Sequence, residues 1–396
     1  MRVAVAGPVD LPCLARLLDR TAEPVVPSGL GGPGTAGLVA ELSRSGHEVT
    51  LVTLSPGIHA PVRQRIGAVD VLIGAYRDRH RARDAFRHER EAVRDLLDSV
   101  DIDVVHAHWT YEFGLGALAS RHPALITVRD WAPTILRRKP DAYRTVRLLM
   151  QSRCLAKASH LTVVSPYMGD RLRRIGRGAA VLVPNGLPVA SFRTSAPGGD
   201  TPVRRVLSVN SDFSRLKNAS TLLRAFPSVR RQSGDVELIL VGNGYEPGGP
   251  AEKWARDRGL AEGTVFAGPM SGERVLEAMD ASDVFVAPSL EESFGMTVLE
   301  AMARGLPVVA GRSSGALPWL LDFGRVGKLV DVRRPEQIAQ AVVQLARDSD
   351  GRAYLSREAL ERARRFAWPN IVPSYEAQYE HVALTSSRRS AWPRTR

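Results

Sequence analysis

The chain has 396 residues, of which 44% are hydrophobic and 24% charged, a composition typical of globular domains and unlike that of disordered or fibrous chains. Its two cysteines are too few for a disulfide framework, and its net charge of +12 comes mainly from arginine. No apolar run approaches the roughly 20 residues of a membrane-spanning helix, and the N-terminus lacks a secretory signal, so we expect a cytoplasmic protein.

Strands alternate with helices along the first half of the chain, a pattern typical of βαβ units that build a parallel sheet. Residues 78–100 are expected to form one amphipathic helix with arginines on its polar face. The other predicted elements are strands at 2–7, 47–54, 68–76, 101–108, 123–130, 160–165 and 179–186, and helices at 35–46 and 143–158.

Residues 193–202, RTSAPGGDTP, predict a linker, after which the alternation restarts. We therefore expect two Rossmann-like α/β domains, residues 1–192 and 203–366, facing each other across a cleft that holds the active site. A last helix at 367–385 is expected to pack back on the N-terminal domain, and residues 386–396 are expected to be disordered. In the second domain the predicted strands are 204–210, 236–244, 264–270, 284–289 and 307–311, and the helices are 218–234, 252–260, 271–283, 295–305 and 335–348.

The stretch SGLGGPGTAG at 28–37 matches the dinucleotide fingerprint G-x-G-x-x-G in its letters but not in its context. That fingerprint directly follows the first strand and needs an acid at the end of the second. Here the first strand ends far upstream, near Gly7, and the second ends at Ser55, so NAD binding is not favoured. Gly31 and Gly32 still let the backbone approach an anionic ligand at the start of the following helix.

The richest stretch, APSLEESFGMTVLEAMARGLPVVAG at 287–311, predicts a strand, a loop and a helix that begins near Phe294. The free N–H groups of that helix's first turn suit a phosphate or sugar hydroxyls. Glu292 precedes the helix, and Glu300 lies two turns on, where a carboxylate can accept hydrogen bonds from the two vicinal hydroxyls of a ribose. The alternative is that both glutamates are solvated helix residues.

This stretch resembles the signature of the retaining glycosyltransferases of family 4, which have the two-domain GT-B fold. Other matching pieces follow in the same order over nearly the whole chain: the glycine loop before TAGLVAELSRSGHEVTLVT, then DVVHAH, VVSPYMGDRL, VPNGLPVASF, LKNASTLLRAF, LILVGNG and VFAGPMSGERVLEAMDASDVFVAPS. The resemblance implies that the N-terminal domain holds the acceptor and the C-terminal domain the nucleotide sugar.

The resemblance also implies residue roles. Glu292 would face the donor sugar, Glu300 would bind the ribose, and Lys217 would contact the diphosphate, so that a fixed cation stabilises the leaving group without a metal or cofactor. Catalysis is expected from Glu292, Lys217 and Arg129. The remaining donor-binding positions are Gly31, Gly32, Arg215, Asn243, Ser293, Phe294, Gly295 and Met296.

The chain departs from the family's pattern at two charged positions. Asp212 stands where the family usually has an arginine, for which Arg215 is a candidate substitute. Arg129, next to Asp130, stands where the family commonly has a histidine, so it is a candidate for contact with the donor phosphate or the acceptor. An inactive relative remains an alternative.

His106 and His108 lie on one side of a strand, at the spacing of a metal-ligand pair. No third ligand is near in the sequence, so we expect both, with Asp130, to contact the acceptor by hydrogen bonds. The seven arginines from Arg77 to Arg94 are expected to form a solvated face. Peripheral docking on an anionic inner membrane, which would suit a lipid-linked acceptor, is the alternative. Nothing supports nucleic-acid binding.

The sequence thus predicts a retaining transferase that moves a sugar from a UDP- or GDP-sugar to a hydroxyl of a lipid-linked, glycan or small-molecule acceptor. One alternative is a GT-B-fold sugar-nucleotide epimerase. The other is a non-catalytic protein that binds a nucleotide sugar.

Overall fold

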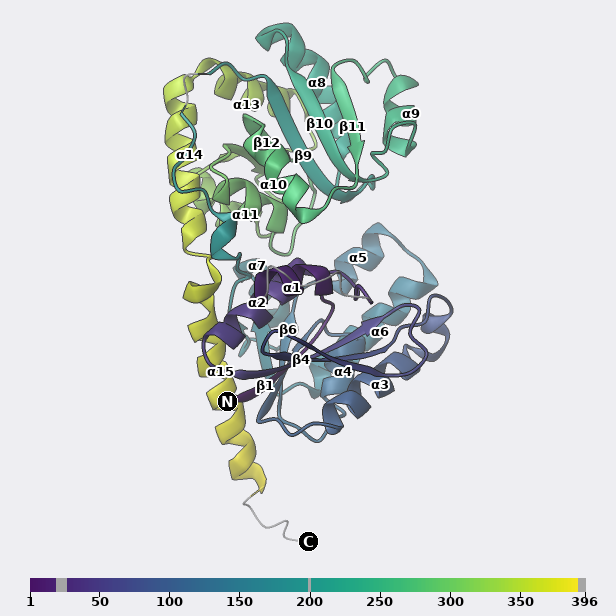
Figure 1. The fold of residues 1–396 in the computed structure, drawn as a ribbon. Coiled ribbons are helices and arrows are strands. Elements are labelled where there is room, and N and C mark those ends of the chain that lie inside the picture. Colours follow the sequence, from purple (N-terminus) through teal and green to yellow (C-terminus); the bar gives the residue numbers. More distant parts are fainter. Residues whose placement is uncertain (19–26, 199–200, 391–396) are drawn as a thin grey trace. The chain divides into compact units, whose positions relative to one another are not determined.

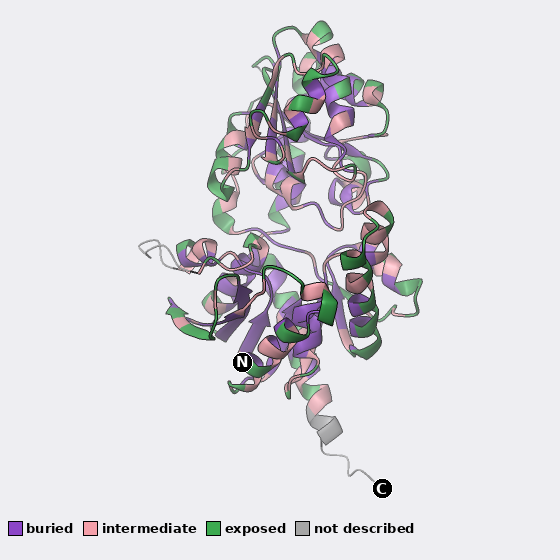
Figure 2. Ribbon diagram, turned by 90° about the vertical axis from the view of Figure 1, so that its right-hand side faces the viewer, coloured by how far each residue is buried: buried purple, intermediate pink, exposed green. Residues whose placement is uncertain are grey.

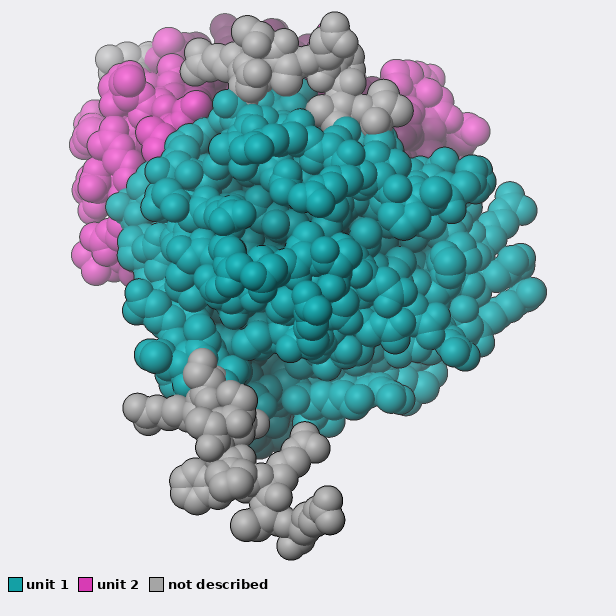
Figure 3. Space-filling model, turned by 60° about the horizontal axis from the view of Figure 1, so that its bottom comes forward, with its two compact units in different colours: residues 1–187, 368–396 teal, residues 188–367 magenta. Residues whose placement is uncertain are grey.

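The computed structural model describes residues 1–18, 27–198 and 201–390, with the side chains of 387–390 left out. It forms two compact units, which Figure 3 colours separately. The N-terminal unit consists of Met1–Leu187 with the last helix from Trp368, and the C-terminal unit is Pro188–Ala367. The division therefore falls at Leu187 rather than at the predicted residue 192, and residues 188–198 of the chain belong to the C-terminal unit.

The N-terminal unit is built on an eight-stranded sheet with the order β3-β4-β2-β1-β5-β6-β7-β8. All neighbours pair in parallel except β3 and β4, which form an antiparallel edge. The strands are β1 Arg2–Ala6, β2 Glu48–Ser55, β3 Val62–Ile66, β4 Val69–Ala75, β5 Val104–His108, β6 Ala124–Val128, β7 His160–Val163 and β8 Val181–Leu182.

Helices connect these strands (Figure 1). They are α1 Leu11–Leu18, α2 Pro33–Arg44, the 3-10 turn η1 Arg81–Asp84, α3 Arg87–Asp98, α4 Glu112–Ala117, α5 Ala132–Arg138, α6 Ala142–Lys157, α7 Pro166–Arg173 and, from the end of the chain, α15 Trp368–Ser390.

The C-terminal unit has a six-stranded, wholly parallel sheet with the order β11-β10-β9-β12-β13-β14. Its strands are β9 Arg205–Asp212, β10 Glu237–Asn243, β11 Thr264–Gly268, β12 Val284–Ala287, β13 Val308–Gly311 and β14 Lys328–Val330. Its helices are η2 Val189–Ser191, α8 Ala219–Ser233, α9 Pro250–Arg256, α10 Gly272–Asp280, α11 Met296–Ala303, α12 Leu317–Leu320, η3 Asp322–Gly324, α13 Pro335–Arg347 and α14 Ser349–Arg364.

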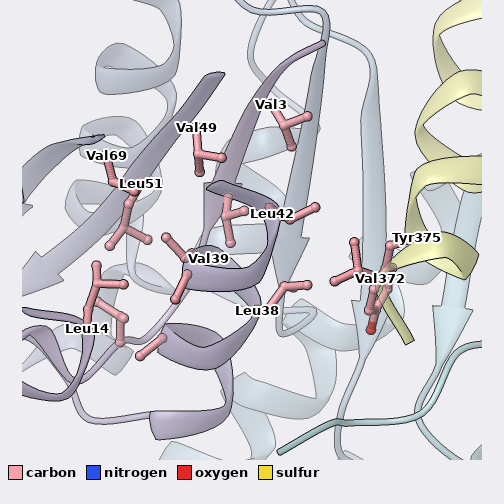
Figure 4. Packing of buried hydrophobic residues seen from close by; sticks show 14 of the residues in the cluster. Val3, Leu14, Leu38, Val39, Leu42, Val49, Leu51, Val69, Val372 and Tyr375 are labelled. Atoms are coloured by element: carbon pink, nitrogen blue, oxygen red, sulfur yellow. The ribbon is translucent and has the colours of Figure 1, made fainter. Parts of the chain in front are cut away.

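The central strands of both sheets are apolar because helices or loops cover both faces. Every residue of β5, β12 and β13 is buried, and Figure 2 shows exposed residues mainly on the surrounding helices and loops. Figure 4 shows the N-terminal core, in which Val39 and Leu42 of α2 meet the valines of β1 and β2. No described helix is long and apolar enough to cross a membrane.

The predicted helix over 78–100 is wrong in its first half. Ala85 and Phe86 adopt left-handed φ values of 50° and 57°, which interrupt any continuous helix, so η1 and α3 form instead. Phe86 is fully buried at this break, and Arg77 fixes the turn by ion pairs to Asp84 at 2.9 Å and Glu89 at 2.6 Å.

The last helix returns to the N-terminal unit, where it packs against α2, β5 and β6 (Figure 1). Trp368 begins it, is 1% exposed, and donates its backbone N–H to Leu187 O at 3.0 Å. A Cβ on Gly37 would lie 2.2 Å from the indole nitrogen, and one on Gly186 2.6 Å from the ring, so only glycine leaves room for Trp368. The helix continues to Ser390, beyond the predicted end at 385, and residues 391–396 of the expected tail lie outside the described range.

Replacement of Trp368 by alanine should destabilise the N-terminal unit by about 3–5 kcal/mol, because it empties a fully buried aromatic site. Urea unfolding of the full chain, followed by circular dichroism, measures the loss. Tyr354→Ala, at an aromatic residue that is 51% exposed, is the matched control. Equal losses for the two variants would show that Trp368 does not anchor the helix.

Candidate functional site

Three loops of the C-terminal unit gather the predicted donor residues at one edge of its sheet. The strands β10, β9 and β12 are neighbours and run in parallel, so their carboxyl ends meet at the same edge. Asn243 ends β10, Lys217 follows β9, and Glu292 follows β12. The predicted set from this half of the chain therefore lies in one region of the C-terminal unit.

Lys217 and Glu292 form an ion pair, with Nζ 2.7 Å from Oε1, although 75 residues separate them in the sequence. Their side chains are 19% and 22% exposed, so both can be reached from solvent. Asn218 holds the two loops together. It is buried at a left-handed φ of 56°, and its Nδ2 donates to Pro288 O at 3.0 Å and to Val332 O at 2.8 Å.

The loop that carries Glu292 is fixed by close backbone contacts. Ala316 N–H donates to Glu292 O at 2.9 Å, and a Cβ on Gly315, whose φ is +64°, would lie 2.2 Å from that oxygen. Gly295, with φ +100°, precedes α11, and a Cβ there would lie 2.4 Å from Leu317 Cδ2. Glycine is therefore needed at both positions, and α11 begins at Met296, close to the predicted start.

Glu300 lies on α11 as a partly buried carboxyl, and no cation among the described residues forms an ion pair with it. Burial raises its pKa to about 7. When ionised, such a carboxylate can accept hydrogen bonds from ligand hydroxyls, which are the partners that it lacks.

The other predicted donor residues differ in accessibility. Phe294 is buried, with ring centroids 6.1 Å from Trp319 and 5.9 Å from Phe366, so only its backbone can face a ligand. Arg215 and Asn243 are exposed, and Asn243 Nδ2 donates to Ser211 O at 3.2 Å. Ser293 and Met296 are partly exposed beside the start of α11.

In the N-terminal unit the glycine loop leads directly into α2. Gly32, with φ +102°, is the residue before the helix, and a Cβ on it would lie 2.5 Å from Pro8 O. Gly31, with φ +75°, is exposed and has open space around its Cβ position. Gly32 is therefore required by packing, whereas Gly31 is the position whose backbone a ligand can approach.

The two histidines of β5 have different environments. His106 is fully buried, with Nδ1 2.8 Å from Tyr379 Oη and Nε2 2.6 Å from Thr127 Oγ1, so both ring nitrogens are already bonded. His108 is fully buried too, so the structure brings neither histidine to the accessible position that the acceptor prediction requires. His108 Nδ1 accepts from Arg129 Nε at 2.8 Å, while its Nε2 has no described partner. Burial keeps the pKa of both rings low.

Asp130 belongs to a polar cluster at the carboxyl ends of β5 and β6 that the sequence did not reveal. Its Oδ1 accepts from Tyr111 Oη at 2.8 Å, and burial raises its pKa. The guanidinium of Arg147 lies 3.4 Å from the centre of the Tyr111 ring and 3.3 Å from Glu112, a fully buried carboxyl whose pKa burial also raises. Trp109, which directly follows β5, adopts a left-handed φ of 76°.

The amino-acid sequence gives only a weak signal for this cluster. An aromatic pair follows the strand end as HWTYE, but Arg147 is one of three arginines on its helix. Only the folded chain shows that it stacks on Tyr111.

The two units match two family descriptions, "Glycosyltransferase Family 4" over residues 34–191 and "Glycosyl transferases group 1" over residues 204–348. The fold is also that of known GT-B enzymes. Sucrose-phosphate synthase from Thermosynechococcus elongatus superposes with a TM-score of 0.77 over 97% of this chain and 100% of that one, at 21% identity.

Among curated relatives, the phosphatidyl-myo-inositol mannosyltransferase of Mycolicibacterium smegmatis is 30% identical over 87% of this chain and 88% of its own. The D-inositol 3-phosphate glycosyltransferase of Corynebacterium kroppenstedtii is 32% identical over 52% of this chain, and the match spans 51% of that relative, about half its length. The chain belongs to glycosyltransferase family 4, as the sequence motifs predicted.

Glu300→Gln should stabilise the folded chain at alkaline pH. The pKa of Glu300 in the folded chain, about 7, lies above the ordinary value of 4.5. Its ionisation therefore lowers the free energy of unfolding progressively as the pH rises from 4.5 to 7, and this loss is complete above pH 7. The variant should therefore match wild type near pH 4.5 and gain up to about 3 kcal/mol at pH 8.5.

Unfolding in urea at both pH values measures this difference. Glu277→Gln, at an exposed glutamate of α10, is the control and should show no such dependence on pH. A Glu300→Gln variant whose stability relative to wild type is the same at both pH values would contradict the raised pKa.

Proposed function

We propose that this chain transfers a sugar from a nucleoside diphosphate sugar, with UDP or GDP as the nucleotide, to a hydroxyl acceptor with retention at the anomeric carbon. The observation that carries the proposal is the Lys217–Glu292 pair beside the start of α11. A sugar diphosphate is bound by a cation and free helix N–H groups at its phosphates, and by a carboxylate that accepts hydrogen bonds from its hydroxyls.

In this proposal Lys217 exchanges its ion pair with Glu292 for an ion pair with the donor diphosphate. Departure of the nucleoside diphosphate builds negative charge on its leaving oxygen, and the ammonium of Lys217 stabilises that charge without a metal. Glu292, released from the ion pair, accepts hydrogen bonds from the sugar hydroxyls. Glu300 accepts hydrogen bonds from the two ribose hydroxyls, and these bonds offset the free-energy cost of burying its carboxylate.

The acceptor hydroxyl attacks the anomeric carbon on the same face from which the leaving group departs. Its proton passes to the departing phosphate oxygen. The C–O bond to the phosphate breaks and the C–O bond to the acceptor forms, so the configuration is retained. The N-terminal unit binds the acceptor, with the Asp130, Tyr111 and Arg147 cluster as its polar part. Gly31, through its backbone, stays a predicted contact of the donor phosphate. The compounds named for the relatives, D-inositol 3-phosphate and phosphatidyl-myo-inositol, are the first acceptors to assay.

A thermal-shift screen of UDP-, GDP-, ADP- and TDP-sugars should identify one donor that raises the melting temperature of the chain. Against that donor, Glu300→Ala should weaken binding by about 10-fold or more, because a charged hydrogen-bond acceptor is lost. Lys217→Met should lower turnover by about 100-fold or more with a smaller effect on binding, because leaving-group charge develops only in the transition state.

Lys253→Met, at an exposed lysine of α9, removes the same charge and is the control. Isomerisation of the donor in the absence of acceptor would instead identify an epimerase. Tight donor binding with no turnover against any acceptor would identify a binding protein.

A further inference from the structure

Arg129 is a largely buried cation with no counter-charge. Among the described residues, no carboxylate lies within ion-pair distance of its guanidinium. Its Nε donates to His108, and its Nη2 is buried without a partner. The neighbouring carboxylate, Asp130, accepts from Tyr111 instead. Because an unpaired buried charge is costly, this arginine indicates an anion that the free chain does not contain.

Two further buried donors without partners lie on residues that contact Arg129 or the neighbouring helix α2. Since His108 Nδ1 accepts a hydrogen bond and burial keeps the ring neutral, its proton is on Nε2, which is a buried donor without an acceptor. The indole N–H of Trp368 also lacks a partner in the described part of the chain. Buried donors seldom go unbonded, so several together need one explanation.

Helix α2 places these groups in one region. Gly34 and Gly37 are three residues apart and share one face of the helix. A Cβ on Gly34 would lie 3.8 Å from Arg129 Nη1, and one on Gly37 would lie 2.2 Å from Trp368 Nε1. The N-terminal end of the α2 dipole adds partial positive charge to the same region, although Thr35 and Ala36 already donate their N–H groups to Gly32 O. Arg129 remains partly exposed, so a ligand can reach it.

We propose that Arg129, whose guanidinium is held by His108, binds an anionic oxygen group, a phosphate or a carboxylate, that the acceptor carries. The planar guanidinium suits such a group because it can donate two parallel hydrogen bonds, and a buried water would satisfy the donors but not the charge. This inference rests on the proposed function, since it assigns an anionic acceptor to the N-terminal unit of a glycosyltransferase. The donor diphosphate is the competing source of the anion.

Thermal shift of the full chain tests the site with inorganic phosphate, glycerol phosphate and glucuronate, each against chloride at equal ionic strength. At saturation, at least one of these anions should raise the melting temperature by about 3 °C or more. Arg129→Met should abolish the shift, and in chloride it should melt no lower than wild type, because it removes an unpaired cation. Arg83→Met, at an exposed arginine of the same unit, is the matched control and should keep the shift.

Arg129→Lys, which keeps the charge but loses the two-pronged donor, should lose most of the shift, and it tests the site if the methionine variant fails to fold.

Binding of UDP should be the same in wild type and Arg129→Met. The proposal is overturned if none of the anions stabilises the chain, or if Arg129→Met keeps the shift. Loss of UDP affinity in Arg129→Met would assign the arginine to the donor instead. If no nucleotide binds but the anions still raise the melting temperature, the result contradicts the proposed function and not the anion site.

Discussion

Parallel strand pairing is the constraint on which both candidate sites depend. Because neighbouring strands run the same way, the loops at their carboxyl ends meet at one edge of each sheet. In the C-terminal unit this brings Lys217 within 2.7 Å of Glu292. In the N-terminal unit it brings the end of β5 to the end of β6, where Arg129 bonds His108. Residues that are far apart in the chain thereby become one chemical group.

The two units repeat one local device at the start of a helix. Gly32 precedes α2 with φ 102° and ψ 65°, and Gly295 precedes α11 with φ 100° and ψ 60°. Side chains rarely adopt this conformation, and at both glycines a Cβ would also collide with a neighbouring group. The device places a helix start at the carboxyl end of a sheet, where the positive end of the helix dipole favours anions.

Each unit also contains an uncompensated buried charge. Glu300 has a raised pKa and no ion pair among the described residues, and Arg129 has a pKa that burial lowers and likewise no ion pair there. Both charges reduce the stability of the free chain, whereas Arg77 is paired with both Asp84 and Glu89. Folding alone does not favour such isolated charges, so their presence is consistent with ligands that supply the missing partners.

The sequence by itself determined the two α/β domains and the glycosyltransferase family, because strand–helix alternation and loop motifs are local patterns. Lys217, Glu292 and Glu300 are donor residues by prediction from the same motifs. It did not determine the break at Phe86 or the antiparallel β3, since a left-handed turn and an edge strand follow from burial and pairing elsewhere in the fold. Only the tertiary structure placed His106 in the core, stacked Arg147 on Tyr111 and left Arg129 without a counter-charge. These features depend on which side chains of distant segments meet, and spacing along the chain does not specify that.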